Sequence, residues 1–180
     1  MKRGVRLVAL AVLAALLAVV AIACGDDKTA TPSASSTSTP AVADWGTVTI
    51  DAGATIRIGL STSLSGGTAQ LGADIRDGAV LAQDAQGRAE IKGHKVEIVP
   101  EDDTCNGQGS QAVANKFVAD PTIVAVIGPM CSGGAVPASD IYNTAHITMV
   151  SSSATNPSVT NRDLPVVFRT AWNDQIQGAG

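Results

Sequence analysis

The sequence predicts a doubly wound α/β fold with a mainly parallel sheet. Short apolar runs alternate with amphipathic stretches, and one of the runs, Ile123–Ile127, is apolar without interruption. Such a run is typical of a strand that is covered on both faces, as in parallel sheets. Because parallel strands need crossover connections, the alternating pattern places helices between the strands and on the faces of the sheet.

The first strand and the first helix open the globular region. Alternating apolar residues over 56–60 predict a strand, and the glycine- and serine-rich turn 63–67 ends it. Helical spacing follows over residues 69–86, and Gly87 ends that helix. The residues expected on its buried side are Leu71, Ile75, Ala79, Ala82 and Ala85.

A second strand and a second helix are expected next. The strand covers residues 95–100, and an acidic loop, 101–103, separates it from the helix. The apolar residues that this helix is expected to carry are Ala112, Val113, Phe117 and Val118.

The stretch from Ile123 to Pro157 predicts a strand, a loop, a helix, a strand and a second loop. The first strand ends at a Gly128-Pro129 turn, and the last loop is rich in serine. Val166–Phe168 begins a fifth strand, and Asp174 can cap a further helix.

Length and charge limit the class of protein. The 180 residues, with a net charge of -4, allow one domain over 44–180 once the N-terminus is set aside. The acidic balance and the lack of a Lys/Arg cluster argue against binding to nucleic acid.

The first 24 residues read as an export signal. A basic start precedes the apolar segment Leu7–Ala23, and small residues stand directly before Cys24. A permanent membrane anchor is the alternative, since the apolar segment is only slightly short of a spanning helix. The ending Ala-Ile-Ala-Cys also resembles a bacterial lipobox, which would make Cys24 a lipidated N-terminus; simple cleavage after Ala23 is the other possibility.

Residues 25–43 form a Ser/Thr/Pro tract that is expected to be a flexible tether. The tract has almost no apolar content and cannot offset the entropy of ordering. After a lipid anchor, such a tether would let the globular domain move near the membrane.

The cysteines and histidines limit which disulfide and metal sites the sequence can form. In an exported protein Cys105 and Cys131 most simply form a disulfide, with two free buried thiols as the alternative. The bridge would join the loop after the second strand to the loop after the third and hold Ser132 beside them. His94 and His146 lack partners at metal-binding spacing, so no metal or cofactor is expected.

An enzyme or a nucleotide-binding function is less well supported by the sequence than binding without chemistry. Gly107–Ala112 fits a GxGxxA pattern but does not directly follow its strand, and Gly128–Gly133 lacks the Lys and Ser/Thr of a phosphate loop. No histidine is placed to activate Ser132. An exported α/β enzyme or nucleotide-binding protein stays the alternative function.

Two uncharged, hydroxyl-rich loops indicate a site for a small polar ligand. Ser132 follows the third strand, and residues 151–155 follow the fourth. In an open parallel sheet, ligands bind beyond the carboxyl ends of the strands, and both loops fall at such ends.

Several motifs in order carry a family resemblance over roughly residues 56–180. They read GLSTSLSGGTAQLG, IKGHKVEIVPEDDTC, QAVANKFV, VIGPMCSGG, PASDIY, SSSATNP and FRTAWNDQIQG. The chain resembles the leucine/isoleucine/valine-binding proteins, type I periplasmic binding proteins of branched-chain amino acid ABC importers. The resemblance implies a two-lobed fold with the ligand in the cleft, of which this chain supplies most of the N-terminal lobe.

The resemblance also implies a function and partners. The chain would be a lipid-anchored, extracytoplasmic subunit that binds a small amino acid without chemistry and hands it to a membrane permease with its ATPase. A ligand-sensing receptor domain of the same fold is an alternative. Since the second lobe would supply part of the site, this chain alone is expected to bind amino acids weakly or undetectably.

Site residues follow from the resemblance residue by residue. Cys105 and Cys131 match the disulfide pair, and Ser132 matches the serine that holds the α-carboxylate of the ligand. Ser153 falls where a backbone carbonyl accepts from the α-ammonium, and Thr155 matches a threonine at the amino-acid head. Leu71 departs from the family, because close relatives often place an aromatic residue there to line the side-chain pocket.

Overall fold

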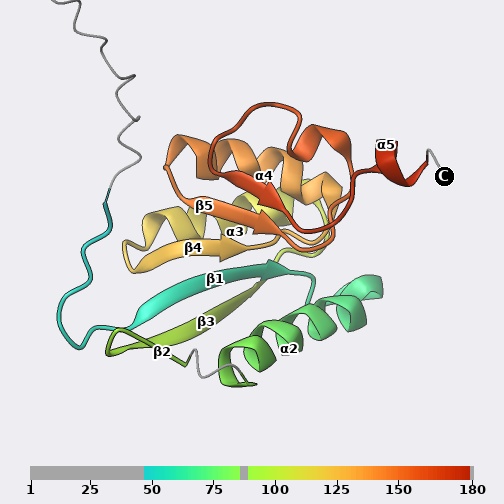
Figure 1. Cartoon of the computed structure of the whole chain (residues 1–180). Coiled ribbons are helices and arrows are strands. Elements are labelled where there is room, and N and C mark those ends of the chain that lie inside the picture. Colours follow the sequence, from blue (N-terminus) through green and yellow to red (C-terminus); the bar gives the residue numbers. More distant parts are fainter. Residues whose placement is uncertain (1–46, 86–88, 179–180) are drawn as a thin grey trace, which may run out of the picture. The chain divides into compact units, whose positions relative to one another are not determined.

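The structure is a computed structural model that describes residues 47–85 and 89–178. All of them belong to one compact unit, Asp44–Gly180. The expected export signal over 1–24, the tether over 25–43, the lipidation of Cys24 and the helix end at Gly87 lie outside the described residues. The strands are β1 (Ile56–Thr62), β2 (Glu90–Ile91), β3 (His94–Asp102), β4 (Ile123–Ile127), β5 (Thr148–Ser151) and β6 (Val167–Arg169), and the helices are η1 (Gly66–Thr68), α2 (Ala69–Ala85), α3 (Gly107–Ala119), α4 (Ser132–Thr144), η2 (Pro157–Val159) and α5 (Asp174–Gln177) (Figure 1).

The strands form one sheet in the order β2-β3-β1-β4-β5-β6. All neighbours are parallel except β2, which pairs antiparallel with β3. The sequence did not predict β2, a two-residue strand whose turn uses positive φ angles at Lys92 and Gly93. The order reverses at β1, with β3 on one side and β4 on the other, so the prediction of a doubly wound sheet is confirmed.

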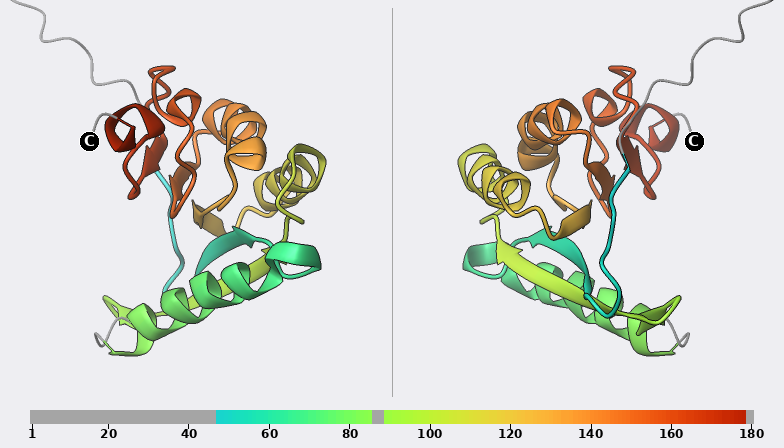
Figure 2. Two further views of the ribbon diagram at one scale, coloured as in Figure 1. Left: turned by 90° about the vertical axis from the view of Figure 1, so that its right-hand side faces the viewer. Right: turned by 90° about the vertical axis from the view of Figure 1, so that its left-hand side faces the viewer.

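Two helices pack on one face of the sheet. Figure 2 shows α3 and α4 on one side of the sheet and α2 on the other. We call the side under α3 and α4 the covered face and the side of α2 the open face. A Cβ at Gly59 would lie 2.7 Å from the Phe117 ring of α3, so Gly59 belongs to the covered face. The register puts Val126, Met149 and Val167 on the same face, and all three are buried in the core.

Within residues 47–85 and 89–178, α2 is the helix that packs on the open face, over β1 and β3. The expected buried side of this helix is therefore partly wrong: Leu71 is 57% exposed and Ala82 is exposed, while Ile75 and Ala79 are half-buried. The expected cover on both faces of Ile123–Ile127 is also wrong, since α2 leaves β4 half-open on this side.

The remaining elements agree with the sequence with small shifts. In α3, Val113 and Phe117 are buried as expected, whereas Ala112 is exposed. The short helix α5 is capped by Asn173, whose side chain accepts a hydrogen bond from the Ile176 N–H, and not by Asp174. Asp174 is the first helical residue, where an acidic side chain also suits the helix dipole.

Candidate functional site

The loops after β1, β3, β4 and β5 meet at the carboxyl edge of the sheet. In this sheet β1 and β4 are neighbours with their following helices on opposite faces, which is the topological switch point where ligands of open α/β sheets bind. We call these four loops the rim. Side-chain bonds join each rim loop to the next, so the rim is one connected structure.

Two aspartates join the β1 loop to the β3 loop. The Leu64 N–H donates to the Asp102 carboxylate at 2.9 Å, and the Ser61 hydroxyl donates to Asp103, also at 2.9 Å. A hydrogen bond from the Ser65 hydroxyl, followed by that from Leu64, holds the pKa of Asp102 below its usual range. Asp103 is fully buried and also accepts from the Cys105 N–H at 2.9 Å.

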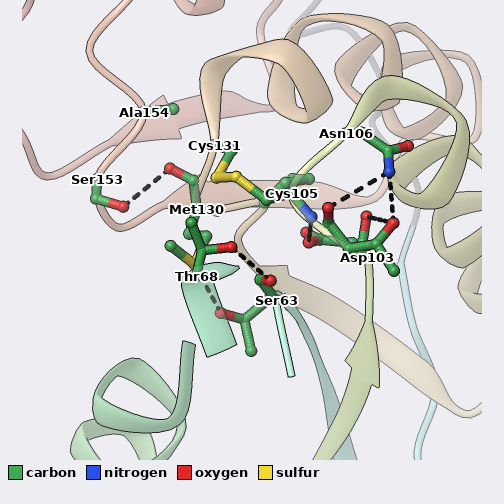
Figure 3. Close-up of a disulfide and its surroundings, with 12 residues drawn as sticks. Ser63, Thr68, Asp103, Cys105, Asn106, Met130, Cys131, Ser153 and Ala154 are labelled. Atoms are coloured by element: carbon green, nitrogen blue, oxygen red, sulfur yellow. Dashed lines mark hydrogen bonds between the residues drawn. A yellow bond between two sulfur atoms is a disulfide. The ribbon is translucent and has the colours of Figure 1, made fainter. Parts of the chain in front are cut away.

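The disulfide joins the β3 loop to the β4 loop, and the predicted pairing of Cys105 with Cys131 is confirmed. The two Cα atoms lie 5.3 Å apart. Cys105 stands just before α3 and Cys131 is the N-cap of α4, so the bridge fastens the starts of both helices (Figure 3). Thr104 and Cys105 have positive φ angles of 52° and 56°, and their N–H groups donate to the carboxylates of Asp102 and Asp103.

Three hydrogen bonds join the β4 loop to the β5 loop. The buried Ser151 hydroxyl donates to the Pro129 carbonyl at 2.6 Å, and the Ser153 hydroxyl donates to the Met130 carbonyl at 2.9 Å (Figure 3). The Asn156 N–H donates to the Ser132 oxygen at 3.1 Å. The serines of this part of the sequence therefore hold the backbone of the rim.

The Ser132 hydroxyl can still donate a hydrogen bond of its own. A serine oxygen has two lone pairs and one hydrogen, and the Asn156 N–H occupies a lone pair. Ser132 is also the first residue of α4, where the N–H groups of Ser132 and Gly133 precede the first intrahelical bond, from Gly134 to the Cys131 carbonyl. A hydroxyl and two N–H groups at a helix start form a set of donors that suits a carboxylate.

Arg169 at the end of β6 holds the β5 loop in place. Its Nη1 donates to the carbonyl oxygens of Thr155 at 3.1 Å and Asn156 at 2.9 Å, with a longer contact of 3.5 Å to that of Ala154. The Asp174 N–H also donates to the Thr155 carbonyl, at 2.9 Å. Sequence reasoning missed Arg169; the signal was a cation at the carboxyl end of a short apolar strand.

Gly128 allows the β4 loop to pass close to β1. Its φ angle is +97°, and a Cβ there would lie 2.0 Å from the Ser61 carbonyl oxygen. Only glycine has both the conformational freedom and the small size for this position. The close approach brings Met130 against the Thr62 hydroxyl, at 3.2 Å from its sulfur.

Three of the four predicted ligand-contact residues lie on two adjoining rim loops. Ser132, Ser153 and Thr155 lie on the β4 and β5 loops, with Ser153 exposed and the other two half-buried. Leu71 lies apart from them in sequence, in the first turn of α2, with its side chain open to solvent. Their roles as ligand contacts stay predictions.

Two kinds of feature are absent from residues 47–85 and 89–178. These residues contain no group of three or more His, Cys, Asp or Glu side chains placed to hold a metal ion. Within the same ranges, no helix combines the length and the apolar character needed to cross a bilayer.

The rim and the sheet define the fold class: an open, doubly wound α/β sheet with serine hydroxyls at its switch point. The family model described as periplasmic binding protein matches residues 55–180. The chain belongs to this periplasmic binding protein family.

Individual relatives refine the comparison. The chain is 42% identical over 124 residues to the leucine-specific-binding protein of Salmonella typhimurium. This match covers 68% of this chain and 33% of that protein. An ABC transporter substrate-binding protein of Desulfitobacterium hafniense, solved in complex with Leu, superposes with a TM-score of 0.60 at 31% identity, over 67% of this chain and 35% of the other. A solute-binding protein from R. palustris, solved with 4-hydroxybenzoate, gives a TM-score of 0.60 at 26% identity, over 66% of this chain and 32% of the other. The chain thus spans about a third of the length of the relatives that it matches.

Proposed function

We propose that this chain forms the carboxylate-binding half of an extracytoplasmic solute-binding subunit for an ABC importer, with a branched-chain or related small amino acid as solute. The observation that carries the proposal is the donor set at the start of α4. There the Ser132 hydroxyl, held by Asn156, and the N–H groups of Ser132 and Gly133 are available to an anion.

The solutes of the relatives support a carboxylate as the shared recognition group. Leu and 4-hydroxybenzoate, bound by two of the similar structures, both carry a carboxylate, and only Leu carries an α-ammonium group. We therefore assign Ser132 to the carboxylate and the Ser153 carbonyl and Thr155 to the ammonium side. Leu71 would face the side chain of the solute.

The partners and the location belong to the same proposal. The solute would pass to a membrane permease driven by an ATPase, with no chemistry on the solute and no enzyme activity. The similar proteins are solute-binding proteins of the periplasmic class. Export through residues 1–24 and lipid anchoring at Cys24 would keep the chain at the outer face of the cytoplasmic membrane.

The test compares the full chain with an extended chain. In the extended chain, the part of the Salmonella leucine-specific-binding protein that comes after its matched region is joined to Gly180. Calorimetry should show weak or undetectable leucine binding by the full chain and clear binding by the extended one. Micromolar binding by the 180-residue chain alone would contradict the expectation that the second lobe is needed.

Variants and other ligands separate the candidate functions. In the extended chain, Ser132→Ala should weaken leucine binding by about 1.5 to 3 kcal/mol, the range for a hydrogen bond to a charged group. Ser158→Ala is the matched control, because Ser158 is an exposed serine of η2, past the segment 151–156 that is bonded to the β4 loop. A rise in melting temperature with ATP or NAD but not with leucine would favour the nucleotide-binding alternative.

A further inference from the structure

A single peptide group connects Arg169 to Ser132. The Thr155 carbonyl and the Asn156 N–H are the two ends of that peptide group, which is planar. Its carbonyl oxygen accepts a hydrogen bond from the Arg169 Nη1 at 3.1 Å, and its N–H donates to the Ser132 oxygen, also at 3.1 Å. The Arg169 side chain and the Ser132 hydroxyl are therefore bonded to opposite ends of one rigid unit.

The orientation of this peptide group is set from its carbonyl end. The Thr155 carbonyl accepts a second hydrogen bond, from the Asp174 N–H at 2.9 Å. The Arg169 Nη1 also donates to the Asn156 carbonyl at 2.9 Å, so two successive carbonyls of the β5 loop turn toward one guanidinium. In a trans peptide the carbonyl and the N–H point in opposite directions. Turning the Thr155 carbonyl toward Arg169 therefore turns the Asn156 N–H toward Ser132.

Arg169 also brings an unneutralised positive charge to this peptide group. Its side chain is half-buried, and none of the ion pairs among the described residues involves it. Arg57, which is half-buried as well, pairs with Asp120 instead. Since an arginine in a protein stays protonated, the positive charge of Arg169 acts on the carbonyl oxygens that it contacts.

The hydrogen bonds run in one direction, from the guanidinium to the serine. A charged donor on a carbonyl oxygen polarises the peptide group and makes its N–H a stronger donor. A stronger bond from the Asn156 N–H to the Ser132 oxygen in turn makes the Ser132 hydroxyl a stronger donor. The same bond occupies a lone pair of that oxygen, so the hydroxyl hydrogen points elsewhere. Arg169 thus favours both the direction and the strength of donation by Ser132.

We propose that Arg169 is a positioning residue of the solute site, acting on Ser132 through the Thr155–Asn156 peptide group. It fixes the peptide group that orients the Ser132 hydroxyl, and its charge strengthens that hydroxyl as a donor to a carboxylate. The inference rests on the proposed function, in which Ser132 binds the carboxylate of the solute. It assigns no contact between Arg169 and the solute.

A role confined to holding the β5 loop makes a different prediction. Either role lowers the melting temperature of Arg169→Met, because carbonyl oxygens of the loop lose their donor. Only the positioning role requires that the hydrogen bond from the Asn156 N–H to Ser132 weakens and that the effect on binding passes through Ser132. The experiments therefore follow this N–H and the coupling between the two side chains.

The first measurement is NMR on the isotope-labelled full chain and needs no solute. Arg169→Met should shift the Asn156 amide-proton resonance upfield, and Ser132→Ala, which removes the acceptor, gives the shift for complete loss of the bond. Arg169→Lys keeps the charge without the planar guanidinium and should give a smaller shift in the same direction. Arg57→Met, at the amino end of β1, is the control and should leave this resonance unchanged. An unchanged Asn156 resonance in a folded Arg169→Met chain would overturn the proposal.

The second measurement is calorimetry of leucine binding by the extended chain defined above. Arg169→Met should weaken binding about fivefold, within the range for the loss of one hydrogen bond. When Ser132→Ala is already present, Arg169→Met should weaken binding by no more than about twofold, because the serine on which it acts is gone. Equal losses with and without Ser132→Ala would overturn the proposal, since Arg169 would then act on another part of the site.

The proposed function and the role of Arg169 can fail separately. An extended chain that binds no leucine in any variant would contradict the proposed function. The Asn156 resonance of the full chain would then decide alone whether Arg169 acts on Ser132. Leucine binding that Ser132→Ala weakens, together with equal losses from Arg169→Met in both backgrounds, would contradict only the role of Arg169.

Discussion

The two faces of the sheet are built from alternate residues of the same strands, yet they differ in almost every physical respect. On β5, Met149 points to the covered face and is fully buried, while its neighbour Val150 points to the open face and is half-exposed. The disulfide and the rim serines strengthen the covered side, because they fasten the starts of α3 and α4. The apolar character of a strand therefore does not tell which of its faces is already covered.

The largest expected effect comes from a matched pair of phenylalanines. Phe117 on α3 is 2% exposed and packs in the core, whereas Phe168 on the open face is 51% exposed. Phe117→Ala should lower the free energy of unfolding by about 3 to 5 kcal/mol, the range for buried aromatic residues. Phe168→Ala should change it by less than about 0.5 kcal/mol. Urea denaturation of both variants checks this, and equal losses would remove the distinction between the faces.

Removing the disulfide should produce the next largest effect. The bridge closes a loop with a sequence separation of 26 residues, for which the chain-entropy model gives about 3 to 4 kcal/mol. Reduction should therefore lower the melting temperature and loosen the β4 loop near Ser132. Thermal melts with and without dithiothreitol test this, with the Cys105→Ser/Cys131→Ser variant as a control that should not respond. An unchanged melt of the wild type would count against the bridge.

A smaller effect is expected from the buried serine at the end of β5. Ser151→Ala leaves the Pro129 carbonyl without the donor that it has at 2.6 Å and the Ala154 N–H without its acceptor at 3.2 Å. The expected loss is about 1 to 3 kcal/mol, as for unpaired buried polar groups. Urea denaturation against Ser158→Ala, an exposed serine, separates this loss from a general effect of serine removal. A loss no larger than that of the control would mean that the β4 and β5 loops do not depend on this bond.

The smallest effect should be a pH dependence of stability that arises from Asp102 in the rim. Hydrogen bonds from Ser65 and Leu64 lower the pKa of Asp102, so its carboxylate contributes stability above the unfolded pKa of about 3.9. That contribution is lost as the pH falls through the lowered folded pKa. Urea midpoints measured from neutral to acidic pH should fall less steeply in Asp102→Asn than in the wild type at the acid end. Parallel curves for the two proteins would mean that Asp102 does not contribute to the loss of stability at acid pH.

The sequence predicted the parts of the fold that depend on local pattern. The strands over Ile56–Thr62 and Ile123–Ile127 and the loops at their carboxyl ends were located because apolar runs and glycine turns are local signals. The exposure of Leu71 and Ile127 could not be predicted in the same way, since it depends on where α2 crosses the sheet.

The sequence predicted on which loops the candidate site residues lie, but not the bonds that hold those loops. Ser132, Ser153 and Thr155 fall on adjoining loops as expected. The bond of Ser132 to the Asn156 N–H and the three carbonyl contacts of Arg169 join residues that are far apart in the sequence, so local patterns do not identify their partners. Asn173 displaced Asp174 as a helix cap because both residues are good caps and only the backbone decides between them.

The connected rim also limits how the solute proposed for this protein could change in evolution. The loop over 151–156 is fixed at Ser151, Ser153 and Asn156 by hydrogen bonds to Pro129, Met130 and Ser132, respectively. An inserted residue would displace at least one of these bonds, although surface loops in general accept insertions readily. New ligand preferences should therefore arise by exchanging side chains that face the ligand, while the lengths of these loops stay constant.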